Sequence, residues 1–114
     1  MIAVIFEFTP APGRFPDYMA LVDELKPELD KAEGFLSLER FESITTPGKF
    51  VSLQFWRDEA SVQKWRNLQM HRDAQKQGRA GIFASYRLRI AGVLRDYTMD
   101  ARVQAPADSV AAHG

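Results

Sequence analysis

The 114-residue chain contains no cysteine. This excludes disulfide bonds, thiolate catalysis and cysteine-ligated metal sites, and it fits a reducing compartment. The chain also has no excess of charge of either sign, because fifteen Lys and Arg balance fifteen Asp and Glu. A balanced charge gives no long-range attraction to nucleic acid or to an anionic membrane surface. We therefore expect neither among the partners of this protein.

Long hydrophobic runs are absent too, and none approaches the roughly 20 residues of a membrane span. The first nine residues lack the basic segment of a secretory signal and alternate like a strand, so we expect a cytoplasmic protein. The sequence contains no phosphate-binding loop, dinucleotide glycine fingerprint or serine-hydrolase elbow. It also shows no metal-spaced cluster of His, Asp and Glu, so we expect no metal site.

Hydrophobic residues make up 46% of the chain, which is typical of one globular domain. Their spacing predicts the order β-α-β-β-α-β. We expect Pro27 to kink or split the first helix, Gly34 to end it, and Asp58 to cap the second. The expected elements are a strand over 1–9, a helix over 14–33, strands over 35–43 and 50–58, a helical region over 58–79, and a strand over 85–97.

This order predicts a ferredoxin-like α+β fold, in which both helices cover one face of a four-stranded antiparallel sheet. To the covered face the alternation assigns Phe6, Phe8, Leu53, Phe55, Leu88 and Ile90. To the open face it assigns Ile5, Phe35, Phe41 and Trp56. Aromatic residues on an open face favour burial against a second copy, so we expect a homodimer. Residues 1–97 form the predicted domain, and 98–114 a flexible extension or an arm on a partner subunit.

Four segments carry a family resemblance over residues 2–97: "APGR" after the first strand, "EGFLSLERFES", "KFVSLQFWRDEASVQKW" and "YRLRIAGV". They resemble the antibiotic biosynthesis monooxygenase superfamily of dimeric α+β barrel proteins. The resemblance implies a homodimer with one cavity per subunit, between the sheet and the helices. It also implies oxidation of phenols, anthrones or quinols by O2, with no flavin or metal cofactor.

Two residues are candidates for catalysis. Trp65 lies on the apolar stripe of the second helix, and similar family members carry a ligand-contacting tryptophan on this helix. The alternative is that Trp65 only anchors the core. His71 is the one histidine before the tail, and its imidazole could accept a substrate proton near neutral pH. It faces inward only if the helix breaks near Leu68 or Gln69, and otherwise it is a surface residue.

Four further residues are candidates for substrate binding. Phe6 and Phe55 would line an apolar slot, and Tyr86 could offer a phenol from the last strand. Arg72 could pair with a carboxylate or phenolate of a ligand, or with an acidic residue of the protein. The bound molecule would be a small aromatic compound.

Three functions fit this pattern. The first is a cofactor-independent monooxygenase acting on a small aromatic, phenolic or quinol-like compound. The second is a non-catalytic ligand-binding or stress-response domain of the same fold. The third is a heme-handling relative, which the sequence disfavours: that branch has an asparagine in the first strand and a histidine ten residues after the tryptophan, where this chain has Gln75.

Overall fold

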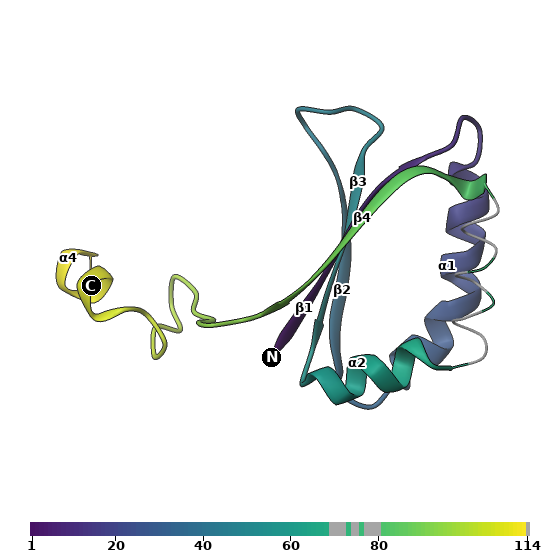
Figure 1. Cartoon of the computed structure of the whole chain (residues 1–114). Coiled ribbons are helices and arrows are strands. Elements are labelled where there is room, and N and C mark those ends of the chain that lie inside the picture. The colour runs from purple at the N-terminus through teal and green to yellow at the C-terminus, as the bar shows by residue number, and fades with distance from the viewer. Residues whose placement is uncertain (69–72, 74–75, 77–80, 114) are drawn as a thin grey trace.

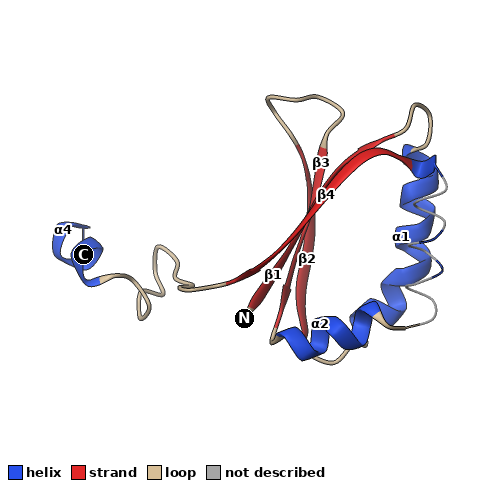
Figure 2. Ribbon diagram, in the orientation of Figure 1, coloured by secondary structure: helices blue, strands red, loops and turns tan. Residues whose placement is uncertain are grey.

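The computed structural model describes residues 1–68, 73, 76 and 81–113. Within this part of the chain, one sheet consists of β1 (Ile2–Pro10), β2 (Phe35–Glu42), β3 (Phe50–Trp56) and β4 (Phe83–Gly92). The strands lie in the order β2-β3-β1-β4, and each neighbouring pair is antiparallel. Helices α1 (Phe15–Asp30) and α2 (Glu59–Arg66) lie on the same side of the sheet (Figures 1 and 2). The predicted ferredoxin-like α+β fold is confirmed.

Local signals in the sequence explain where the helices begin. Pro16 lies in the first turn of α1, where a missing backbone N–H leaves no hydrogen bond unmade. Asp58 caps α2 as predicted, because its carboxylate accepts a hydrogen bond from the Ser61 N–H at 2.8 Å. Pro27 does not split α1, which continues through it to Asp30. The helix ends at Asp30, earlier than the predicted end at Gly34. Gly34 lies in the connection to β2 and adopts a left-handed conformation.

Two clusters of buried side chains join the helices to the sheet. The first surrounds the fully buried Trp56 and consists of Leu29, Trp56, Val62 and Trp65. The second consists of Phe8, Tyr18 and Ile82. In the second cluster the Tyr18 and Phe8 rings stack with 4.4 Å between their centroids. Each such buried apolar side chain contributes about 1.5–3 kcal/mol to the free energy of folding.

The predicted face assignment of β3 is wrong. Trp56 is 0% exposed and packs against α2, whereas the sequence assigned it to the open face. Phe55 and Leu53 alternate with it and therefore lie on the open face, where Phe55 pairs with Ala3 of β1. Apolar residues occupy both sides of this strand, so a period of two predicts the alternation but not which set meets the helices.

The assignment of Phe35 is wrong for a different reason. The pairing of β2 with β3 is irregular between Phe35 and Ser37, and an irregularity of this kind breaks the alternation of side chains. Phe35 consequently packs edge-on against Trp56, with 5.3 Å between ring centroids. Phe41, on the regular part of β2, stays on the open face and is 44% exposed.

The end of the chain extends away from the sheet. Strand β4 ends at Gly92, before the predicted end at Tyr97, and the tail contains an unpredicted helix, α4 (Ala107–His113). Figure 1 shows α4 standing apart from the sheet and the other helices. The radius of gyration is 16.6 Å, against about 13 Å for a compact chain of this length. None of the helices in the described residues has the length and hydropathy to cross a membrane.

Candidate active site

A cavity of about 540 Å³ lies between the sheet and the helices. This volume is within the range of small-molecule binding sites. The lining includes members of both buried clusters, so the cavity lies between them. Its apolar lining residues are Val4, Phe6, Leu21, Val22, Leu25, Leu29, Phe35, Leu38, Val62, Trp65, Phe83, Leu88 and Ile90.

Trp65 forms part of the cavity wall from α2. Its side chain is 6% exposed, and its ring lies 6.3 Å from the ring of Trp56. The residue therefore belongs to the buried core and to the cavity lining at once. The two interpretations offered by the sequence, core anchor and pocket wall, both describe its position.

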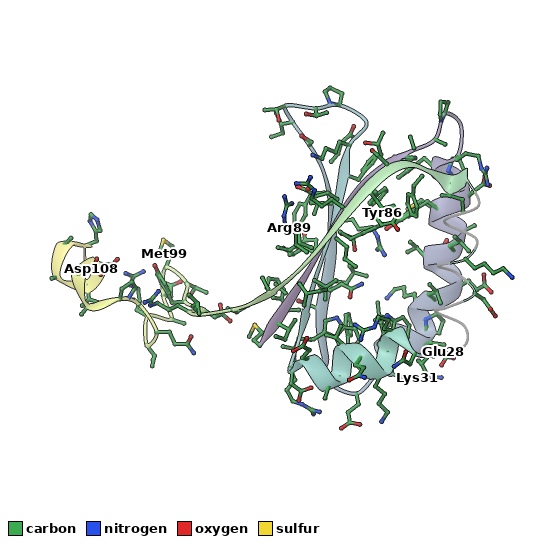
Figure 3. All side chains as sticks on the ribbon, in the orientation of Figure 1. Glu28, Lys31, Tyr86, Arg89, Met99 and Asp108 are labelled. Atoms are coloured by element: carbon green, nitrogen blue, oxygen red, sulfur yellow. The ribbon has the colours of Figure 1, made fainter. Side chains whose placement is uncertain are left out.

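Phe6 and Tyr86 line the cavity from the neighbouring strands β1 and β4. Their rings lie 5.6 Å apart, and each also contacts Phe83. Tyr86 is 49% exposed, so the β4 side of the cavity is open in this chain. Figure 3 shows Tyr86 on the side of β4 that faces α1, and Arg89 on the opposite side.

Of the remaining predicted site residues, the structure describes only Phe55. Phe55 is absent from the cavity lining because it lies on the open face of the sheet. This corrects the prediction that Phe55 would line the slot. His71 and Arg72 lie outside the described residues.

The polar residues of the lining that were not singled out as site residues from the sequence include Tyr18, Arg40, Ser52 and Gln54. Arg40 Nε donates a hydrogen bond to the Tyr18 hydroxyl at 2.9 Å. Gln54 Oε1 accepts one from Trp56 Nε1 at 2.9 Å. Arg40 and Ser52 are paired in the register of β2 with β3. Correct placement of Trp56 would have revealed Ser52 and Gln54, because alternate residues of one strand share a face.

Exposed ion pairs hold the start of α2 beside the end of α1. Glu33 accepts hydrogen bonds from Lys64 at 3.1 Å and from Arg57 at 3.2 Å, and these contacts lower the pKa of its carboxyl. Hydrogen bonds from the Ser61 hydroxyl and N–H, and then from Arg57, lower the pKa of Asp58 to about 2. Asp58 is therefore ionised at neutral pH, as suits an acceptor at a helix N-terminus.

Among the described residues, no group of three or more His, Cys, Asp or Glu side chains is placed to hold a metal ion. The charged residues of the cavity lining are Lys26, Asp30, Arg40 and Arg66. Lys26 and Asp30 form an exposed ion pair with 3.0 Å between Nζ and Oδ2. The site thus consists of an apolar chamber with a small number of polar groups in its wall.

Solved structures of low sequence identity share this fold. The chain superposes on Rv0793 of Mycobacterium tuberculosis with a TM-score of 0.74 and 20% identity, covering 85% of this chain and 98% of the other. It superposes on a conserved protein of Methanosarcina mazei with a TM-score of 0.71 and 19% identity, covering 79% and 89%.

Sequence comparison identifies a relative of higher sequence identity and the family to which the chain belongs. A Pyricularia oryzae protein named jasmonate monooxygenase ABM is 41% identical over 123 residues, which include 100% of this chain and 56% of the relative. The chain thus spans about half the length of that relative. The model of the antibiotic biosynthesis monooxygenase family matches residues 1–77. Because this match covers more than half of the sequence, the chain belongs to the antibiotic biosynthesis monooxygenase family.

Proposed function

We propose that this protein is a monooxygenase that oxidises a small aromatic, phenolic or quinol-like compound with O2 and needs no cofactor. The observation that carries the proposal is the cavity of about 540 Å³ beside the buried Trp65, in a chain of this family. Its mostly apolar wall suits a flat hydrophobic ring system, and its few polar groups suit the orientation of one or two oxygen atoms.

The proposed reaction needs no external reductant for an anthrone-like substrate. Removal of a proton gives an electron-rich anion that transfers an electron to O2 directly. The activated CH2 group becomes a carbonyl group that contains one atom of the O2, and the other atom leaves as water. The protein contributes exclusion of water, orientation of the ring, and hydrogen bonds to the charge that develops on oxygen.

Three residues would share the binding of the ring. Trp65 offers a broad aromatic surface from α2, and Phe6 and Tyr86 offer smaller ones from the sheet. His71 remains the proposed base, on the sequence argument that imidazole accepts a proton near neutral pH. Arg72 remains a second-rank candidate for pairing with a substrate oxygen anion.

The name of the Pyricularia oryzae relative favours a second substrate class within the same activity. Jasmonate is the anion of a small, mostly apolar carboxylic acid. Hydroxylation of a saturated carbon in such a molecule would take two electrons and two protons from a reductant for each O2. Oxygen uptake that depends on an added reductant would therefore separate this class from the phenols and anthrones.

We also propose that the protein acts as a homodimer, with the open faces of two sheets packed together. Phe41 is 44% exposed there, and none of the described helices covers that face (Figure 2). Burial of apolar side chains against a second copy would remove this surface from water. The extension over 98–114 stands away from its own domain and is a candidate arm on the partner (Figure 1).

Oxygen uptake with anthrones and hydroquinones tests the activity. The wild type should consume O2 faster than buffer, and Trp65→Phe should lower kcat/KM at least about tenfold through loss of orientation. Loss of a general base in His71→Ala should lower the rate by about 10²- to 10⁴-fold.

A pair of tryptophan substitutions provides the control. Leu25→Trp places a large ring in the cavity lining and should reduce the rate, whereas Leu94→Trp, at a position that is 88% exposed, should not. If no compound on the panel raises O2 consumption above the buffer rate, the protein is better described as a ligand-binding domain. A Soret band on hemin titration that His71→Ala abolishes would favour the heme-handling alternative.

A further inference from the structure

One side of the cavity wall concentrates hydrogen-bond donors. We call Tyr18, Arg40, Ser52 and Gln54 the polar corner. The register of β2 with β3 pairs Arg40 with Ser52 and Leu38 with Gln54, so these side chains occupy adjacent rows of one sheet face. The Tyr18 hydroxyl meets them from α1, through its hydrogen bond from Arg40 Nε at 2.9 Å.

Arg40 has a positive charge that no described residue neutralises. It forms no ion pair with any carboxylate in the described part of the chain. The acid of the cavity lining, Asp30, already pairs with Lys26 at 3.0 Å. The Arg40 side chain is half-buried, and its charge lies 5.7 Å from the centre of the Tyr18 ring. A partly desolvated guanidinium without a carboxylate partner favours an anionic ligand.

A second, independent observation at Ser52 indicates that the polar corner binds a ligand. Its side chain lines the cavity and is 5% exposed, yet its hydroxyl has no hydrogen-bond partner among the described residues. Buried hydroxyl groups in folded proteins are nearly always hydrogen-bonded, to the protein or to a bound molecule. An acceptor atom of a ligand beside Arg40 would satisfy this group.

Trp56 orients the side-chain amide of Gln54 so that this amide can also donate a hydrogen bond to a ligand. The indole N–H can only donate, so its hydrogen bond to Gln54 Oε1 at 2.9 Å fixes which end of the amide points to Trp56. The NH2 end is thereby left to donate elsewhere, and within the described residues it has no acceptor. Fully buried Trp56 holds the amide in this orientation.

We propose that the polar corner binds a carboxylate, and that the ligand of this cavity is an apolar molecule with one carboxylate group. Arg40 would pair with the carboxylate, and Ser52 and Gln54 would donate hydrogen bonds to its oxygens. The apolar body would extend along Phe6 and Leu88 toward Trp65. The inference rests on the proposed function only in taking this ligand to be the substrate.

Calorimetric titration with 1-naphthylacetate and with its uncharged methyl ester tests the proposal without any turnover. The wild type should bind the carboxylate about 10- to 100-fold more tightly than the ester, as expected for charge-assisted hydrogen bonds in a partly buried site. Arg40→Met should bring the two affinities to within about twofold of each other. Arg40→Lys, which keeps the charge but loses the planar fork, should keep part of the preference.

Two further variants test whether a change in affinity reflects the lost contact rather than a disturbed fold. Ser52→Ala should weaken carboxylate binding a few-fold and weaken ester binding less, because a hydrogen bond to a charged oxygen is the stronger one. Arg95→Met makes the same change as Arg40→Met at an exposed position outside the cavity lining, and it should keep the preference.

Three results would overturn the proposal. They are equal affinity of the wild type for acid and ester, a preference that survives Arg40→Met, and no carboxylate binding at millimolar concentration. A protein that prefers the carboxylate but consumes no O2 would instead contradict the proposed activity alone.

Discussion

The substitution Trp56→Phe measures how much one buried side chain contributes to the free energy of unfolding through packing and through its hydrogen bond to Gln54. Trp56 is 0% exposed, packs against Phe35 and Trp65, and donates a hydrogen bond to Gln54. The exchange removes apolar ring atoms worth about 1.5 kcal/mol of transfer free energy, at about 0.8 kcal/mol per methylene-sized group. The void that remains adds about 1 kcal/mol. The lost hydrogen bond adds about 1 kcal/mol more.

We therefore expect Trp56→Phe to lower the free energy of unfolding by about 3 to 4 kcal/mol, the sum of these losses. A chain of this length has a total stability of roughly 6 to 17 kcal/mol, so the variant should still fold. Urea unfolding followed by circular dichroism, at one fixed protein concentration, gives the difference.

A double-mutant cycle with Gln54→Leu isolates the hydrogen bond from the packing. In the Gln54→Leu background, Trp56→Phe should cost about 1 kcal/mol less than in the wild type. A total loss below about 1.5 kcal/mol, or no coupling between the two sites, would refute the claim that Trp56 anchors the core and orients Gln54.

Three other predictions concern the scaffold. Gly34→Ala should destabilise the protein by about 2 to 4 kcal/mol in urea unfolding, because φ is +80° and a new Cβ would lie 2.6 Å from Ser61 Cβ. Gly48→Ala, with φ +85° and no atom within 4 Å, should cost only about 1 kcal/mol, and equal effects at both sites would contradict the close approach. Hydrogen bonds, chiefly from Ser61, lower the pKa of Asp58 to about 2 in the folded protein. The ionised carboxylate therefore stabilises the fold above pH 4, and this stabilisation disappears as the pH falls to 2. Thermal melts of wild type and Asp58→Asn should therefore differ at pH 6 and converge near pH 2, and a constant difference would exclude this role. Phe41→Glu on the open face should halve the molecular mass in sedimentation equilibrium, whereas Ile44→Glu, in the exposed turn before β3, should not. A wild type that sediments as a monomer would contradict the dimer proposal.

The order and type of the elements could be predicted because their signals are local. Asp58 and Pro16 lie at helix starts. The alternation within β1 is enough to predict that Phe6 and Phe8 face the helices, with no information from other segments. The helical spacing of Val62 and Trp65 likewise brings both to the covered face. Each of these features depends on neighbours within about one turn or one strand.

The polar corner could not be predicted from the sequence, because it depends on which face of β3 is buried and on pairing between distant segments. Both faces of β3 have bulky apolar residues, so local pattern alone could not decide that Ser52 and Gln54, rather than Phe55, face the helices. Arg40 on β2 and Tyr18 on α1 are neighbours only through the folded chain.

The α+β order, the Asp58 cap of α2 and the presence of Trp65 in the covered layer all follow from residues that are close together in the sequence. Which side of β3 is buried, and where Arg40 meets Ser52, depend on packing between elements that are far apart in the sequence. Burial of Trp56 against α2 selects one face of β3, and every alternate side chain on that strand then lies on the same face.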